Sequence, residues 1–225
     1  MGKSQHWRVE LHCHTQASFD SLASPEAIVR ACRARGIDRI AITDHNTMAG
    51  IAAVQALAPD LVIPGEEIKT AEGELLGWFM TEPIPGGLSL AETLERLHAQ
   101  GAVVGVPHPL DRLRMGSALG REALLRVINQ VDALEVLNAR CLRKRDNDEA
   151  MALAKHYDKL ITAGSDAHAS LEVGTATMLM PPFHDADSFR QSLRQAQIQG
   201  KRSCRFVRSY STFAKLYKRA RKRFR

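Results

Sequence analysis

Metal-binding side chains occur in five short segments of the chain. Four of these segments directly follow an apolar run typical of a β-strand, and the third lies just beyond a fifth such run. The segments are His12-Cys13-His14, Thr43-Asp44-His45, Gly65-Glu66-Glu67, Pro107-His108-Pro109 and Gly164-Ser165-Asp166-Ala167-His168. Imidazole and carboxylate together form the ligand set of zinc, manganese and iron. Because the carboxyl ends of parallel strands converge at one mouth of a barrel, the pattern predicts a multinuclear metal site and hydrolytic chemistry.

Two of these segments place candidate ligands two residues apart. In an extended strand, residues i and i+2 face the same side. His12 and His14 can therefore bind one ion together, and Asp166 and His168 repeat the same spacing. Cys13 lies between the first pair and faces the opposite way, so we expect it to pack in the core and not to act as a nucleophile.

Other members of the set could bind metal or could have ordinary structural roles. Asp20 lies in a turn and can add an oxygen ligand, and Glu67 can bridge two ions. Asp44 could instead cap the next helix, and a single histidine is usually a satisfied structural residue. Five coincident sites at strand ends favour a common centre, because functional residues must converge in space.

The elements needed to position these residues alternate between strand and helix. Ser24 and Pro25 indicate a helix start, and Ser89 with Glu92 forms a capping box. Alternating strands and helices predict βαβ units and a parallel sheet that closes into a barrel. The expected strands are 7–11, 37–43, 61–63, 102–106, 133–137 and 160–163, the helices are 24–35, 46–58, 89–100, 121–130, 143–157 and 186–199, and an irregular hairpin covers 68–80.

Composition favours a soluble protein with one catalytic domain. The 225 residues, of which 44% are hydrophobic and 25% charged, suffice for a sizeable core. No run approaches the roughly 20 apolar residues that cross a bilayer, so we expect no transmembrane segment. The four cysteines form no CxxC pair, which favours reduced thiols and a cytoplasmic location. We place the catalytic barrel at residues 1–200 and a basic tail at 201–225.

The net positive charge of the chain comes from the tail. The net charge is +6, yet residues 201–225 contain eleven Lys and Arg and no acid, so the body is mildly acidic. Apolar residues recur at helical spacing and predict a basic amphipathic helix, whose apolar face could dock on the acidic body. The tail could also bind nucleic acid, another polyanion or anionic lipid, and a packed or solvated end is equally open. The apolar positions are Phe213, Leu216, Tyr217 and Ala220.

The five motifs, in this order, resemble those of the PHP (polymerase and histidinol phosphatase) family over about residues 9–199. The resemblance implies a distorted (β/α)7 barrel, TIM-like, with a multinuclear metal site at the C-terminal ends of the strands. It implies that one ion is held by His12, His14, Glu67 and Asp166, a second by Glu67 and His108, and a third by Asp20, His45 and His168.

The chain departs from the family pattern at one position. Many relatives have a histidine in an H-x-L-G segment after the glutamate, whereas this chain has Glu74-Leu75-Leu76-Gly77. Glu74 either supplies an oxygen ligand, which would favour manganese or iron at the second site, or is a solvated hairpin residue. The sequence leaves both alternatives open.

The resemblance implies a phosphoesterase with two or three divalent ions (Mn, Zn or Fe). Adjacent ions lower the pKa of a bridging water, so the expected reaction is attack by a metal-activated hydroxide on a phosphomonoester or nucleoside bisphosphate. Arg112 and Arg140 follow strand ends and are candidates for phosphate binding. We expect Asp20, Asp166 and His168 to be the catalytic residues.

Other functions fit the same residues. The basic tail is compatible with an exonuclease-like enzyme that trims short oligonucleotides. A non-catalytic, metal-stabilised module is a further alternative, although the complete ligand set argues against it. A metal-dependent amidohydrolase is more distant, since such barrels usually bridge their ions with a carboxylated lysine, and Lys69 stands two residues past Glu67.

Overall fold

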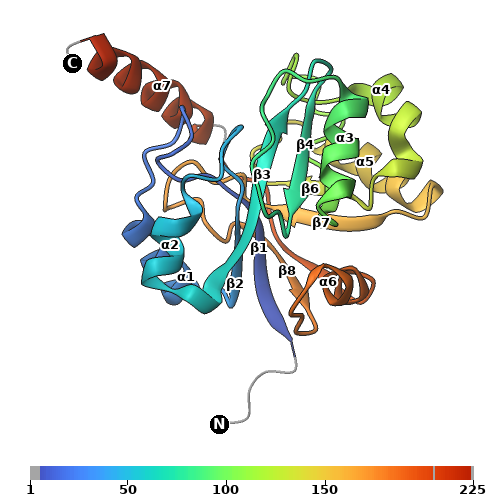
Figure 1. Ribbon diagram of the computed structural model, residues 1–225, viewed down its shortest axis with the longest axis horizontal. Helices are drawn as coiled ribbons and strands as arrows, with labels where there is room; N and C mark the ends of the chain where they lie inside the picture. Colours follow the sequence, from blue (N-terminus) through green and yellow to red (C-terminus); the bar gives the residue numbers. More distant parts are fainter. Residues whose placement is uncertain (1–5, 205, 224–225) are drawn as a thin grey trace.

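A nine-stranded mixed sheet forms the centre of the molecule in the computed structural model, which describes residues 6–204 and 206–223 (Figure 1). The strand order is β7-β6-β5-β4-β3-β2-β1-β8-β9. The strands are β1 (Trp7–Cys13), β2 (Arg39–Ile42), β3 (Val62–Lys69), β4 (Glu74–Trp78), β5 (Val103–Val106), β6 (Ala133–Asn138), β7 (Leu160–Gly164), β8 (Ala176–Met180) and β9 (Gln197–Gly200).

The sheet curves until its first and seventh strands meet. Strands β1 to β3 are parallel to one another, as are β5 to β7, while β4 runs antiparallel between the two groups. Just past the strand ends, the amide of His14 donates to the carbonyl of Ala167 at 2.9 Å, and the amide of Ala167 donates to His12 at 3.2 Å. These bonds make a nearly closed barrel, which confirms the expected TIM-like fold class.

In the described part of the chain, six α-helices pack around the barrel and a seventh extends from it. In Figure 1, α1 and α2 lie on one side of the sheet and α3, α4 and α5 on the other. The predicted caps are present: Ser24 accepts from the amide of Ala27, and Ser89 and Glu92 form the reciprocal capping box. The helices are α1 (Pro25–Arg35), α2 (Ile51–Leu57), α3 (Leu90–Ala99), α4 (Gly120–Val127), α5 (Lys144–His156), α6 (Ala186–Leu193) and α7 (Val207–Arg223).

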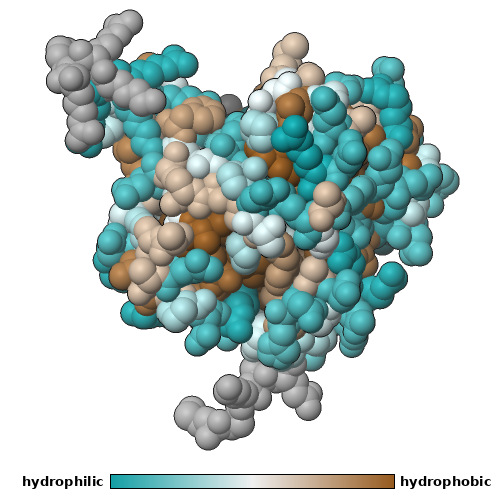
Figure 2. Space-filling view, in the orientation of Figure 1, coloured by the Kyte–Doolittle hydropathy of each residue, from teal (hydrophilic) through white to brown (hydrophobic). Residues whose placement is uncertain are grey.

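Aliphatic side chains build most of the core. Cys13 is fully buried beside Ile28 and Ile42, as strand alternation predicts, and all four cysteines are free. Trp78 is also fully buried, and its indole nitrogen donates to the carbonyl of Leu11 at 3.0 Å. The visible outer face is largely hydrophilic (Figure 2). Within residues 6–204 and 206–223, no helix has the length and apolar character needed to cross a membrane.

Several expected boundaries are wrong. The helix expected over 186–199 ends at Leu193, because Gln197–Gly200 pairs with β8, a strand that was not expected. Long-range pairing here overrides local helix propensity. Helix α2 begins at Ile51 and not at Asn46, which has a positive φ of 53°. Strand β3 continues through Lys69, so Glu67 lies inside a strand that pairs with β4.

The tail forms the predicted helix, and docking of its apolar face on the body, one of the alternatives that the sequence left open, is not observed. Phe213 and Leu216 on α7 are 58% and 60% exposed, so the apolar face does not dock on the body. The opposite face, which includes Arg208, Ser211 and Lys215, contacts the barrel. Arg208 on this face donates to the carboxylate of Asp111, and Lys215 lies 3.7 Å from Asp20, so opposite charges meet at this contact.

Removing the α3 cap should destabilise the fold without touching the metal centre. We expect Ser89→Ala to lower the free energy of unfolding by about 1 kcal/mol, since the amide of Glu92 loses its acceptor. Urea denaturation measures this change. Ser209→Ala on the exposed face of α7 is the control and should change stability by less than about 0.5 kcal/mol. Equal effects of both substitutions would contradict the capping role.

Candidate metal centre

All nine side chains predicted as metal ligands come together at the end of the barrel where the parallel strands have their C-terminal ends. They derive from β1, from β3 and β4, and from the loops after β1, β2, β5 and β7. All are buried except His45, whose side chain is 11% exposed. The nine residues are His12, His14, Asp20, His45, Glu67, Glu74, His108, Asp166 and His168.

Glu67 lies at the centre of this cluster. Its Oε2 atom lies 3.3 Å from the Nε2 atoms of both His12 and His14, and 3.1 Å from Nδ1 of His45. Its Oε1 atom lies 3.2 Å from Nε2 of His108. A carboxylate with neighbours on both oxygens is suited to bridge two ions, which is the role expected for Glu67.

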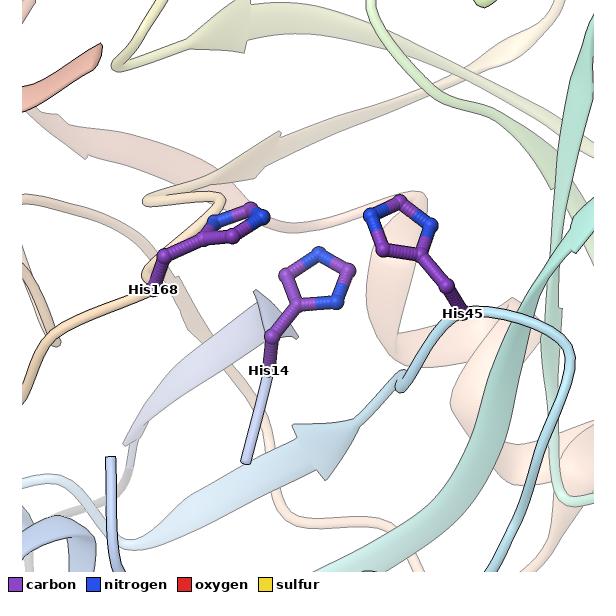
Figure 3. Close-up of side chains that lie close together, drawn as sticks. All are labelled: His14, His45 and His168. Carbon is purple, nitrogen blue, oxygen red and sulfur yellow. The ribbon is translucent and has the colours of Figure 1, made fainter. Parts of the chain in front are cut away.

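A second group of ligands lies toward the outer side of the cluster. The rings of His14, His45 and His168 point toward one another (Figure 3). Oδ2 of Asp20 lies 3.3 Å from Nε2 of His168 and 3.6 Å from Nε2 of His45. Oδ1 of Asp166 lies 3.6 Å from Nε2 of His14. These groups overlap in the way that adjacent metal sites share ligands.

Unsatisfied polar atoms indicate that the cluster fits divalent ions. Nε2 of His12, Nε2 of His14, Nδ1 of His108 and Oδ1 of Asp20 are buried without a hydrogen-bond partner among the described residues. A buried polar atom without a partner costs free energy. A bound cation would satisfy the atoms of His12, His14 and Asp20, and the mixed nitrogen and oxygen donors suit manganese, zinc or iron.

Glu135 holds two of the candidate ligands from behind. Its Oε1 atom lies 3.0 Å from Nδ1 of His12, and its Oε2 atom accepts from the amide of His108 at 2.8 Å. A carboxylate behind a histidine fixes the ring and leaves the other nitrogen for a metal. Sequence reasoning missed Glu135, although an acid inside the apolar strand β6 was a usable signal.

Asp44 organises the loop that carries Asp20. Its carboxylate accepts from the amide and hydroxyl of Thr15, both at 2.7 Å, and from the hydroxyl of Ser18 at 2.6 Å. The Ser18 hydroxyl also lies 3.2 Å from Nδ1 of His14. Asp44 therefore positions both a loop and a candidate ligand, and it does not cap α2, whose N-cap is a glycine.

Mutual charge keeps the carboxylates ionised. Burial would raise the pKa of Asp166, but Arg114 and His12 hold it well below its usual range. Burial lowers the pKa of His45, yet Glu67 and Asp20 raise it to about 9. Since a metal binds the neutral imidazole, ion binding at neutral pH must displace protons from the cluster.

Glu74 is buried, so the alternative of a solvated hairpin residue is wrong. Only 5% of the residue is exposed, and its Oε2 atom lies 3.7 Å from Nε2 of His108. Ser117 donates to Oε1 at 3.0 Å. Burial and the neighbouring Glu67 raise the pKa of Glu74. Its position is that of an additional oxygen donor beside His108.

The two predicted phosphate-binding arginines lie in different surroundings. Arg112 forms ion pairs with Asp146 at 2.7 Å and Glu149 at 2.6 Å on α5 and points away from the cluster. Arg114, two residues later, reaches the cluster and pairs with Asp166. The irregular loop around Arg114 gave no sequence signal for this contact. Arg140 is buried and lies 2.7 Å from Nδ1 of His168.

A cavity of about 260 Å³ opens over the candidate ligands. It is lined by Phe19, Asp20, His45, Glu74, Arg114, Ser117, Arg140, His168, Arg208, Ser211, Thr212 and Lys215. A larger hollow of about 700 Å³ lies beside β6, α5 and β9, but Asp148 is the one acid in its lining and is paired with Lys144. The smaller cavity holds the groups that can do chemistry.

Comparisons with known proteins agree with this geometry. Residues 10–103 match the PHP domain, and residues 144–198 match the PHP-associated region. An uncharacterized protein of Methanocaldococcus jannaschii is 37% identical over 171 residues, which cover 75% of this chain and 68% of that protein. A 5'-3' exoribonuclease of Haemophilus influenzae is 30% identical over 46% of this chain but only 43% of its own length.

Among solved structures, one similar fold is a two-domain protein from Bacteroides vulgatus that contains a predicted PHP-like metal-dependent phosphoesterase. Its TM-score is 0.73 at 18% sequence identity. The match covers 87% of this chain and 65% of that one, so it supports the barrel fold of this chain over nearly its whole length.

Weakening the support behind His12 should lower metal affinity. We expect Glu135→Gln to reduce the affinity for Mn²⁺ or Zn²⁺ by about 10- to 100-fold, because the amide orients the ring less strongly than the carboxylate. Competition with a chelating dye measures this affinity. Glu95→Gln, at an exposed position on α3, is the control and should leave it unchanged. Unaltered affinity in Glu135→Gln would contradict the supporting role.

Proposed function

The chain belongs to the PHP family of metal-dependent phosphoesterases, and we propose that it hydrolyses a phosphate ester of a small metabolite or nucleotide. The observation that carries this proposal is the convergence of nine imidazole and carboxylate side chains in one cluster. Four of them, Asp20, His45, Glu74 and His168, line a cavity that arginines also line. Imidazoles and carboxylates recruit the ions, and guanidinium groups match a phosphate. Substrates with one or two phosphates, such as a phosphomonoester or a nucleoside bisphosphate, fit this combination.

In the proposed chemistry, the ions activate water and an arginine binds the phosphate. Two or three divalent ions would supply Lewis acidity and a nucleophilic water at neutral pH. Asp20, Asp166 and His168 contribute by holding ions in place. Arg114 has a side chain that is 17% exposed and lines the cavity, so it can turn its guanidinium toward an equatorial phosphate oxygen.

Arg140 is better suited to positioning than to binding substrate. Its guanidinium contacts His168 at 2.7 Å and Glu172 at 3.3 Å. Only 4% of Arg140 is exposed. It therefore fixes the orientation of a ligand ring and of the cavity wall. We assign the phosphate contact first to Arg114, in place of Arg112.

The size of the cavity favours a small substrate. A volume of about 260 Å³ lies just below the range of ordinary ligand pockets, which is about 300–1,000 Å³. Helix α7 forms part of its wall. A compact phosphate ester fits such a space with its phosphate at the ions.

Trimming of short oligonucleotides is the second candidate. The similarity to the exoribonuclease of Haemophilus influenzae favours it, although the match spans less than half of that protein. The basic residues of α7 would favour an anionic chain leading away from the cavity. An oligonucleotide would place only its terminal nucleotide in the cavity.

Phosphate release tests the proposed function. With Mn²⁺ and a panel of phosphomonoesters, nucleoside 3',5'-bisphosphates and short oligonucleotides, we expect release from at least one class. Asp166→Ala with His168→Ala should reduce the rate at least about 100-fold. His184→Ala with Asp187→Ala, a matched pair at exposed positions, should retain it. Release by the Asp166/His168 variant would place the activity elsewhere, and no release by metal-loaded parent would favour a non-catalytic module.

The two arginines of the 110–120 loop should differ in their effect on activity. We expect Arg114→Lys to lower kcat/KM by about 100-fold, because lysine lacks the planar fork that matches phosphate. Arg112→Lys should stay within about twofold, since Arg112 contacts α5. Steady-state kinetics, with metal content measured in parallel, tests both. A loss confined to Arg112→Lys would restore the original assignment of Arg112.

A further inference from the structure

Helix α7 comes from the end of the chain yet supplies part of the cavity wall over the metal ligands. Arg208, Ser211, Thr212 and Lys215 from this helix line the same cavity as Asp20 and the candidate ligands His45 and His168. In Figure 1, α7 lies beside the loops that follow the first strands and far from α6, the preceding helix. The tail is thus part of the candidate active site.

Specific contacts fix α7 in this position. Arg140 donates to the carbonyl of Val207 at 2.8 Å and to the hydroxyl of Ser211. Arg208 donates to the carbonyl of Arg140 at 3.0 Å and to the buried carboxylate of Asp111 at 2.5 Å. Arg140 also contacts His168, so this one side chain links the helix to a candidate metal ligand.

The orientation of α7 has a cost in apolar burial. Docking through Phe213, Leu216 and Tyr217 would remove apolar surface from water, at about 25 cal/mol per Å². These side chains are instead 58%, 60% and 43% exposed, while the basic face turns to the cavity. The orientation therefore brings the cationic groups of Arg208 and Lys215 to the cavity and leaves the apolar side chains in contact with water.

Lys215 is an accessible cavity residue of α7. Its side chain is 41% exposed, and its Nζ atom lies 3.7 Å from Oδ2 of Asp20 and 5.0 Å from the centre of the Phe19 ring. A separation of 3.7 Å is long for a hydrogen bond, so the ammonium group has donors left for another acceptor. Thr212, one helical turn earlier, adds a hydroxyl to the same wall.

We infer that α7 caps the active site and that Lys215, with Thr212, binds a second anionic group of the substrate, distinct from the phosphate that is hydrolysed. The inference rests on the proposed function, because the metal ligands define where the reacting phosphate lies. Lys215 then acts as a specificity-determining residue. It selects small esters that carry another phosphate or a carboxylate over esters with one charged group.

Kinetics with two substrates tests this role. We compare p-nitrophenyl phosphate, which has one anionic group, with adenosine 3',5'-bisphosphate, using the full-length protein with Mn²⁺. Lys215→Met should raise KM for the bisphosphate about tenfold, the effect of losing one charge-assisted hydrogen bond, and leave kcat/KM for the aryl phosphate within about twofold. Arg219→Met removes the same charge from an exposed position of α7 and should alter neither substrate.

A binding measurement separates failure of the inference from failure of the proposed function. Adenosine 3',5'-bisphosphate should raise the Tm of the parent and of Arg219→Met more than that of Lys215→Met, whether or not any substrate is hydrolysed. Thr212→Val should reduce the same Tm shift in part. Equal loss of activity on both substrates, or a Tm shift that Lys215→Met leaves intact, would overturn the subsite.

Discussion

The structure depends on compensating the charge of carboxylates that are buried in the mouth of the barrel. Glu67 and Asp166 are each 1% exposed and carry pKa values held well below normal, so both are ionised. A buried ion costs several kcal/mol unless partners surround it. Imidazoles and Arg114 supply that compensation, and divalent ions would complete it. The bonds that close β1 against β7 keep the partners at the required separations.

The backbone at two candidate ligands shows what this arrangement requires. His108 and Asp166 adopt positive φ angles of 32° and 52°, which non-glycine residues rarely occupy. Glu135 accepts from the amide of His108, and Arg114 with Asn138 binds the carboxylate of Asp166. Several bonds thus determine each strained position, and this redundancy keeps the ligands oriented before any ion binds.

The sequence predicted the barrel and the convergence of the candidate ligands, because both follow from local rules. When a ligand directly follows an apolar strand, the direction of that strand is enough to predict at which end of the barrel the ligand lies. Residues set by long-range contacts were not predictable: Arg114 reaches Asp166 from an irregular loop, and β8 and β9 form by pairing with each other. The orientation of α7 stayed open at the level of the sequence for the same reason, since periodicity finds an apolar face but not which face meets a partner.

Charge balance explains why a basic helix belongs over a metal centre. Without ions, the ligand carboxylates attract α7, as the approach of Lys215 to Asp20 shows. Two or three divalent ions would offset these carboxylates, and Lys215 would then face a less negative cavity, whereas Arg140 and Arg208 would keep Glu172 and Asp111 as partners. Because like charges repel, an anion lying between the ions and Lys215 would favour α7 in this position. A substrate with more than one anionic group would supply such an anion.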